Sequence, residues 1–119
     1  MKYVLMYTNR PDLDEAVPKE RIEQVYGEIF AWFEKNAAVL TDAGAELQDV
    51  STATTVKSGD NQPVVVDGPF NEAKEVVGGF SVIDVPDLDA AIELVKTWPS
   101  LDFPGVAIEI RPIVDHSGG

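Results

Sequence analysis

The stretch "GGFSVIDVPDLDAAIELVKTWP", residues 78–99, limits the choice of fold more than any other part of the chain. Its first half is rich in Phe, Val and Ile and predicts a strand over residues 76–85. Gly78 and Gly79 interrupt that strand and indicate a bulge or a close backbone approach rather than a phosphate-binding loop. Asp87 is the expected N-cap of a helix that ends at Pro99. The apolar residues of this helix recur at steps of three or four, at Leu88, Ala91, Ile92, Val95 and Trp98.

The N-terminal half predicts a strand followed by a long helix. Residues 2–8 place Tyr3, Leu5 and Tyr7 on one face and apolar residues on the other, as in a central strand. Residues 9–17 predict a polar loop, and Pro18 can open a helix over residues 19–43 that ends at Gly44. The expected buried face consists of Ile22, Tyr26, Ile29, Phe30, Phe33, Ala37 and Leu40. A second stripe of Val25, Trp32 and Val39 indicates a further contact with a loop or another subunit.

The remaining strands complete an α+β domain. Residues 46–57 and 62–66 predict two strands of a hairpin joined by the turn at 58–61, and residues 106–113 predict a last strand. The order β-α-β-β-β-α-β is that of a ferredoxin-like domain, with two helices on one face of an antiparallel sheet. The other face would be open, and such a face favours pairing with a second subunit. We expect one domain over residues 1–114 and a flexible tail over 115–119.

The composition excludes several classes of function. The 119 residues include 9 basic and 21 acidic ones, a net charge of −12, so nucleic acid and anionic membranes would be repelled. The N-terminal apolar run is too short for a signal sequence or a membrane span. The chain has no cysteine, which excludes disulfides and thiol chemistry and fits the cytoplasm. Neither a His/Cys cluster nor EF-hand spacing is present, so we expect no metal and no cofactor.

The segment "VDGPFNEAKEVVGGF", residues 66–80, resembles the signature of the DGPF proteins, a branch of the YCII-related family. The usual motif is Asp-Gly-Pro-Phe-Ala-Glu-Thr-Lys-Glu, and this chain departs from it only at Asn71 and Ala73. The segments "ATTV" at 53–56, "EIRPI" at 109–113 and the stretch at 78–99 are similar to the family as well. The resemblance implies a homodimer of the dimeric α+β barrel type. It also implies a role beside an extracytoplasmic-function sigma factor.

A few relatives in the wider family are small lyase-like enzymes, and they resemble a His–Asp design with the His on the first helix. The matching position in this chain is about Phe33, which cannot exchange protons. The only histidine, His116, lies close to the C-terminus. The resemblance therefore leaves open whether the chain is an enzyme.

The turn "DGPF" has a structural explanation, in which Asp67 closes an Asx turn, Gly68 adopts positive φ and Phe70 anchors the loop in the core. A functional alternative is that the same turn forms one wall of a ligand pocket. Beyond it, Glu72 and Glu75 are the candidate general bases. Lys74 can bind an anionic ligand, pair with a carboxylate such as Glu109, or assist catalysis.

Two further side chains are candidates for ligand binding. Arg111, which faces away from the helices, can clamp a ligand carboxylate or pair with an acid across a dimer. Tyr7 ends the first strand and can offer its hydroxyl to a pocket, although a half-buried strand tyrosine is the more ordinary role. Three hypotheses remain: a ligand-binding or regulatory module, a small cofactor-independent lyase or hydrolase, and a motif that only stabilises the dimer.

Overall fold

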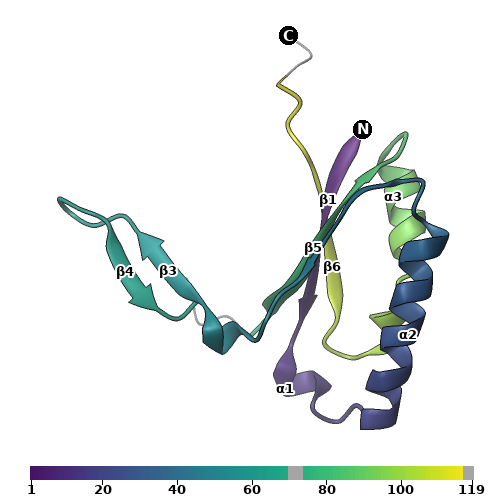
Figure 1. The fold of residues 1–119 in the computed structure, drawn as a ribbon, viewed down its shortest axis with the longest axis horizontal. Helices are drawn as coiled ribbons and strands as arrows, with labels where there is room; N and C mark the ends of the chain where they lie inside the picture. Colours follow the sequence, from purple (N-terminus) through teal and green to yellow (C-terminus); the bar gives the residue numbers. More distant parts are fainter. Residues whose placement is uncertain (70–73, 117–119) are drawn as a thin grey trace.

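Four strands form one antiparallel sheet in the order β2-β5-β1-β6 (Figure 1). The computed structural model describes residues 1–69 and 74–116. The strands of the sheet are β1 (Lys2–Asn9), β2 (Leu40–Glu46), β5 (Val76–Asp84) and β6 (Ala107–Pro112). With helices after β1 and after β5, this order is that of a ferredoxin-like domain, and the predicted α+β fold class, the type found in dimeric α+β barrels, is confirmed.

Two helices, α2 (Lys19–Lys35) and α3 (Leu88–Val95), lie on one face of this sheet (Figure 1). The predicted N-cap of α3 is confirmed, because the Asp87 side chain accepts a hydrogen bond of 2.9 Å from the Ala90 amide. The short elements are α1 (Pro11–Asp14) and the 3-10 helices η1 (Val50–Thr52) and η2 (Pro99–Asp102).

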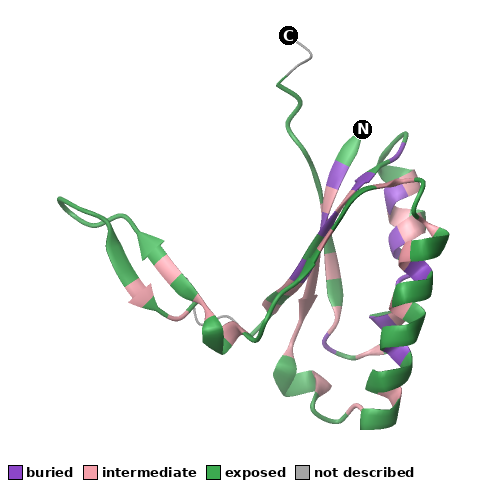
Figure 2. Cartoon of the chain, in the orientation of Figure 1, coloured by how far each residue is buried: buried purple, intermediate pink, exposed green. Residues whose placement is uncertain are grey.

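The core lies between the sheet and these two helices, where Figure 2 shows most of the buried residues. Trp98 is at its centre. Its ring stacks on Tyr7 with centroids 4.3 Å apart, and Trp32 meets it edge-on at 5.0 Å. Of the two apolar faces of the first strand, the one that carries Tyr3 and Leu5 is buried in this core.

The long helix ends earlier than the sequence pattern predicts. It stops at Lys35, and Asn36 ends it with a side-chain amide that donates to the Trp32 carbonyl at 2.8 Å. Residues 40–46, most of which were assigned to the helix or its end, form strand β2 beside β5. Gly44 therefore marks an irregularity of this strand, with φ of +76°. A Cβ there would lie 1.7 Å from the Phe80 carbonyl oxygen.

The buried face of α2 also differs from the prediction. Ile22, Tyr26 and Phe30 are 36%, 46% and 70% exposed, whereas Val25 and Trp32 from the second stripe are buried. Apolar residues occupy much of the circumference of this helix, so periodicity alone does not fix its orientation. In the observed orientation of the helix, Trp32 points into the core and packs against the Trp98 ring.

The segment after β2 contains a shorter first strand than the sequence predicts. Residues 46–57 predict a single strand, but Asp49 caps η1 by accepting from the Ser51 amide at 3.0 Å. Only β3 (Thr54–Lys57) is extended, and it pairs with β4 (Val64–Asp67). The predicted hairpin is therefore confirmed with shorter strands. We call residues 54–67 the arm.

The arm extends from the sheet on the side opposite α2 and α3 (Figure 1). As a result the radius of gyration is 16.5 Å, against about 13.5 Å for a compact domain of this length. The accessible surface is 8377 Å², against about 6,300 Å² for a compact monomer of this mass. The chain thus exposes roughly 2,000 Å² more than a compact monomer would.

Candidate functional site

Two chain junctions meet at one end of the sheet. Asn9 pairs with Val76, so Arg10, which follows β1, and Glu75, which precedes β5, lie at the same edge. Arg10 binds Asp12 through two hydrogen bonds, Nη2–Oδ2 at 2.8 Å and Nε–Oδ1 at 3.3 Å. We call Arg10, Asp12, Lys74 and Glu75 the basal rim.

The four charges of the basal rim influence one another. The hydrogen bond from Arg10 lowers the pKa of Asp12, and the charge of Lys74 adds a smaller effect in the same direction. Asp12 raises the pKa of Arg10, and Glu75 contributes to that increase. Lys74 and Glu75 are exposed, so the rim faces solvent. It brings two candidates from the sequence motif beside two residues, Arg10 and Asp12, that sequence reasoning missed.

A third segment fixes the α1 side of the basal rim. The Gly105 amide, in the loop before β6, donates to Asp14 Oδ1 at 2.7 Å. Gly105 is buried, and a Cβ there would lie 2.7 Å from the Arg10 carbonyl oxygen. Only glycine allows this approach. The rim therefore stands on a fixed turn.

The Tyr7 side chain lies on the helix side of the sheet and not at the basal rim. Its hydroxyl donates to Ser81 Oγ at 2.9 Å, and Ser81 Oγ donates to the Ala43 carbonyl at 2.7 Å. Burial raises the pKa of Tyr7 to about 12, so the hydroxyl is neutral at physiological pH. Ser81 is fully buried and was also missed. A serine between Gly79 and Ile83 at an inward strand position was the available signal.

The turn at the end of β4 belongs to the base of the arm. Asp67 lies opposite Thr54 and is exposed. Gly68 has φ of +132°, which confirms the predicted positive φ. Its amide donates to the Ala53 carbonyl at 2.8 Å. Thr55 Oγ1 donates to the Gly68 carbonyl at 2.7 Å. Phe70 and Glu72, the other motif candidates, lie outside the described residues.

Arg111 lies on β6, opposite Val4 and therefore away from the basal rim. Its guanidinium pairs with Glu109 on the same strand, and both side chains are exposed. The sequence makes Lys74 a candidate partner of Glu109. In the structure the partner of Glu109 is Arg111 instead. Phe33, the position matched to a catalytic histidine, is half-buried with its ring edge-on to Trp98 at 5.9 Å.

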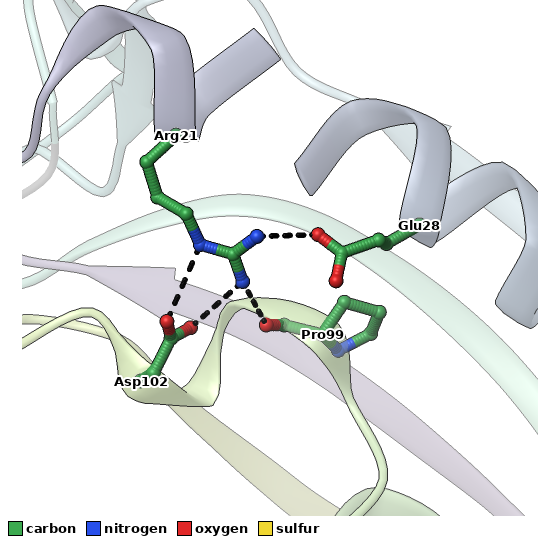
Figure 3. A network of polar contacts seen from close by, with 4 residues as sticks. All are labelled: Arg21, Glu28, Pro99 and Asp102. Atoms are coloured by element: carbon green, nitrogen blue, oxygen red, sulfur yellow. Dashed lines mark hydrogen bonds and ion pairs between the residues drawn. The ribbon is translucent and has the colours of Figure 1, made fainter. Parts of the chain in front are cut away.

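A second polar network joins α2 to η2 (Figure 3). Arg21 Nε and Nη2 each bind one oxygen of Asp102 at 3.3 Å, and Nη2 also binds the Pro99 carbonyl at 3.3 Å. Nη1 binds Glu28. A hollow of about 340 Å³ lies beside this network, lined by Arg21 and Phe103 among others. Because these partners already engage the guanidinium, the network acts as a clamp between elements and is a poor ligand site.

The comparisons with known proteins agree with the fold and identify the family. The model of the YCII-related domain matches residues 1–117. The chain belongs to the YCII-related family. An uncharacterized protein of Rhizobium meliloti (strain 1021), R00369, is 28% identical over 124 residues, which is all of this chain and 97% of that protein.

A solved structure shows the same fold. It is 5-chloro-2-hydroxyhydroquinone dehydrochlorinase (TftG) from Burkholderia phenoliruptrix AC1100 in complex with 2,5-dihydroxybenzoquinone. The two share 17% identity with a TM-score of 0.56, over 96% of this chain and 94% of the other. At this identity the likeness concerns the fold alone.

Residues 1–69 and 74–116 show neither a metal-binding cluster nor a membrane-spanning helix. They contain no group of three or more His, Cys, Asp or Glu side chains placed to hold a metal ion. None of the helices in these ranges is long and apolar enough to cross a membrane.

Proposed function

We propose that this YCII-related chain is a homodimeric binding or regulatory module of the DGPF branch, with a small polar ligand held at the basal rim. The observation that carries the proposal is the pairing of Asn9 with Val76, which places Arg10 and Asp12 at the same end of the sheet as Lys74 and Glu75. A structural motif needs no such cluster at the open end of a sheet. Two cations and two carboxylates on one surface suit a polar ligand that carries charge.

A thermal-shift screen of small polar compounds tests this proposal. A ligand that binds only the folded chain raises its melting temperature, and the increase grows with the logarithm of the ligand concentration above the dissociation constant. We expect a compound that stabilises the wild type to lose its effect in Lys74→Ala. Lys96→Ala is the matched control, because Lys96 pairs with Glu93 on exposed helix surface and lies outside the rim.

Two results would contradict a ligand site at the rim. One is an equal response of Lys74→Ala and the wild type to every stabilising compound. The other is loss of the dimer in a folded Lys74→Ala variant, which would make the motif a structural element of the dimer. Circular dichroism checks the fold of each variant, and light scattering checks its mass.

The surface area of the chain supports the proposed homodimer. An excess of roughly 2,000 Å² per chain fits the area that one partner of an obligate dimer buries, about 1,000–2,500 Å². The open face of the sheet is the natural contact, since Val4 pairs with Val82 and Met6 with Phe80 on that side. Phe80→Asp should therefore convert the dimer to a monomer in sedimentation experiments. An unchanged mass would exclude this face.

The proposed physiological partner is an extracytoplasmic-function sigma factor in the cytoplasm. The net charge of −12 supports a basic protein partner and argues against direct contact with DNA. Co-purification with the purified sigma factor at low and high salt tests this pairing. A complex that weakens with salt supports it, and absence of a complex at low salt contradicts it.

Catalysis is the second candidate, because the fold neighbour TftG is a dehydrochlorinase. Glu75 is exposed, and a solvated carboxylate is a weak general base at neutral pH. Arg111 lies too far along β6 to clamp a substrate at the rim. We therefore expect no chloride release from 5-chloro-2-hydroxyhydroquinone. Turnover that Glu72→Gln or Glu75→Gln abolishes would favour the enzyme instead.

A further inference from the structure

The arm is a two-stranded hairpin without support from its own core. Among the described residues, neither β3 nor β4 pairs with a third strand. An isolated two-stranded hairpin is marginally stable in water, because three strands or a packed helix are needed to cover an apolar face. The arm therefore requires a surface that covers it.

The apolar residues of the arm are those that such a surface would bury. Val56 pairs directly with Val65, and the two side chains are 65% and 68% exposed. Val64, one position earlier on β4, is also exposed. β-Branched residues directly opposite each other form an apolar patch on one face of the hairpin. Single exposed valines are ordinary, but a facing pair on a projecting element marks a contact.

The base of the arm is held firmly. The Gly68 amide donates a hydrogen bond to the Ala53 carbonyl, and the Gly68 carbonyl accepts one from the Thr55 hydroxyl. Both hydrogen bonds join the end of β4 to the start of β3. The preceding turn is closed by Asp49, which caps η1. An element fixed at its base loses little entropy when its tip binds, so the arm is pre-organised for association.

The direction of the arm identifies its partner. It extends on the open side of the sheet, away from α2 and α3 (Figure 1). Sheets that face each other pack about 10 Å apart, and a strand of four residues spans about 13 Å. Any second chain seated on the open face therefore comes alongside the arm. The excess surface of the chain is also of the size that a second copy would cover.

We propose that the arm clasps a second copy of this chain, with Val56 and Val65 buried against the partner. This inference rests on the homodimer of the proposed function and adds a second contact to its open sheet face. In a two-fold dimer each chain gives one arm and receives one, so a change in the arm alters both contacts at once.

A pair of charge insertions tests the clasp by the dimer dissociation constant. Val65→Asp should weaken the dimer by about tenfold or more, because it places an unpaired carboxylate in the contact. Phe30→Asp adds the same charge on the helix side, at a side chain that is 70% exposed against 68% for Val65. It should change the dissociation constant less than about twofold. Equal effects of the two substitutions would overturn the clasp, since they would reflect net charge alone.

Cysteine labelling gives an independent readout, since the natural chain contains no cysteine. Val65→Cys should react with a maleimide about tenfold more slowly in the dimer than in the diluted monomer, whereas Phe30→Cys should react equally in both. If the wild type is monomeric at all concentrations, the homodimer of the proposed function and the clasp both fail. If the dimer forms, but Val65→Asp leaves it unchanged and Val65→Cys is not protected, only the clasp fails.

Discussion

The sheet layer and the arm use similar residues in opposite surroundings. Val25 of α2 is 4% exposed because its own chain covers it, while Val65 of β4 is 68% exposed. Burial contributes about 25 cal/mol per Å² of apolar surface, so valines stabilise the layer within one chain and can stabilise the arm only through a partner. The comparison teaches that folding and association draw on different parts of this molecule.

The largest effect is expected from the centre of the layer. Trp98→Ala removes a buried ring that contacts Tyr7, Trp32 and Phe33, and its Nε1 hydrogen bond to Ser100. We expect the free energy of unfolding to fall by about 3–5 kcal/mol, as for other buried tryptophans. Urea denaturation followed by circular dichroism measures this change.

The control for Trp98→Ala is Val65→Ala in the arm. At a protein concentration that keeps the chain monomeric, we expect a change within about 0.5 kcal/mol. A loss as large as that of Trp98→Ala would show that the arm belongs to the folding core, and the distinction between the two regions would be wrong.

A smaller effect is expected from Tyr7 at high pH. The unfolded chain loses the Tyr7 proton near pH 10, whereas the folded chain loses it near 12. Rising pH between these values therefore favours unfolding, and stability should decline by up to about 2 kcal/mol across that window. Tyr7→Phe should show a shallower decline in pH-dependent urea denaturation. An identical decline in both proteins would mean that other groups cause it.

Much of the fold can be read from local patterns in the sequence. The strand at residues 76–84 and the Asp87 cap follow from residues that are neighbours in the chain. The end of α2 was misplaced because residues 37–43 continue an apolar spacing that a helix and a strand share. Gly44 ends no helix, since its positive φ serves a close approach to Phe80, a residue distant in sequence.

The candidate site was less predictable. The motif drew attention to Lys74 and Glu75, but their neighbours Arg10 and Asp12 are identified only by the pairing of β1 with β5. Tyr7 is directed to Ser81 by an antiparallel register that no local pattern gives. Contacts between residues far apart in the chain depend on topology, and a single sequence carries little information on them.

A still smaller effect on stability is expected from the network between Arg21 and its partners in Figure 3. Arg21→Gln removes the bonds to Asp102, Glu28 and the Pro99 carbonyl, and it should lower the melting temperature of the chain because three contacts between α2 and η2 are lost together. Arg111→Gln makes the same charge change at an exposed pair with Glu109, where we expect less than about 0.5 kcal/mol. Thermal denaturation of both variants tests the difference. Equal losses would show that the clamp stabilises no more than a surface ion pair.

The smallest effect on the stability of the whole chain is expected from a substitution at the base of the arm, where the change should be confined to the arm. A Cβ added at Gly68 or at Gly27 meets nothing within 4 Å, so the two positions differ in backbone conformation alone. Gly68→Ala forces alanine into φ of +132°, which strains the turn, whereas Gly27→Ala lies in α2 and should stabilise the chain by about 0.5–1 kcal/mol. Because the arm adds little to the core, Gly68→Ala should leave the unfolding midpoint nearly unchanged.

The effect of Gly68→Ala should instead appear as amide hydrogen exchange about tenfold faster between Thr54 and Asp67, with the exchange of β1 and β5 unaffected. Faster exchange throughout the sheet would show that the arm and the layer unfold as one unit.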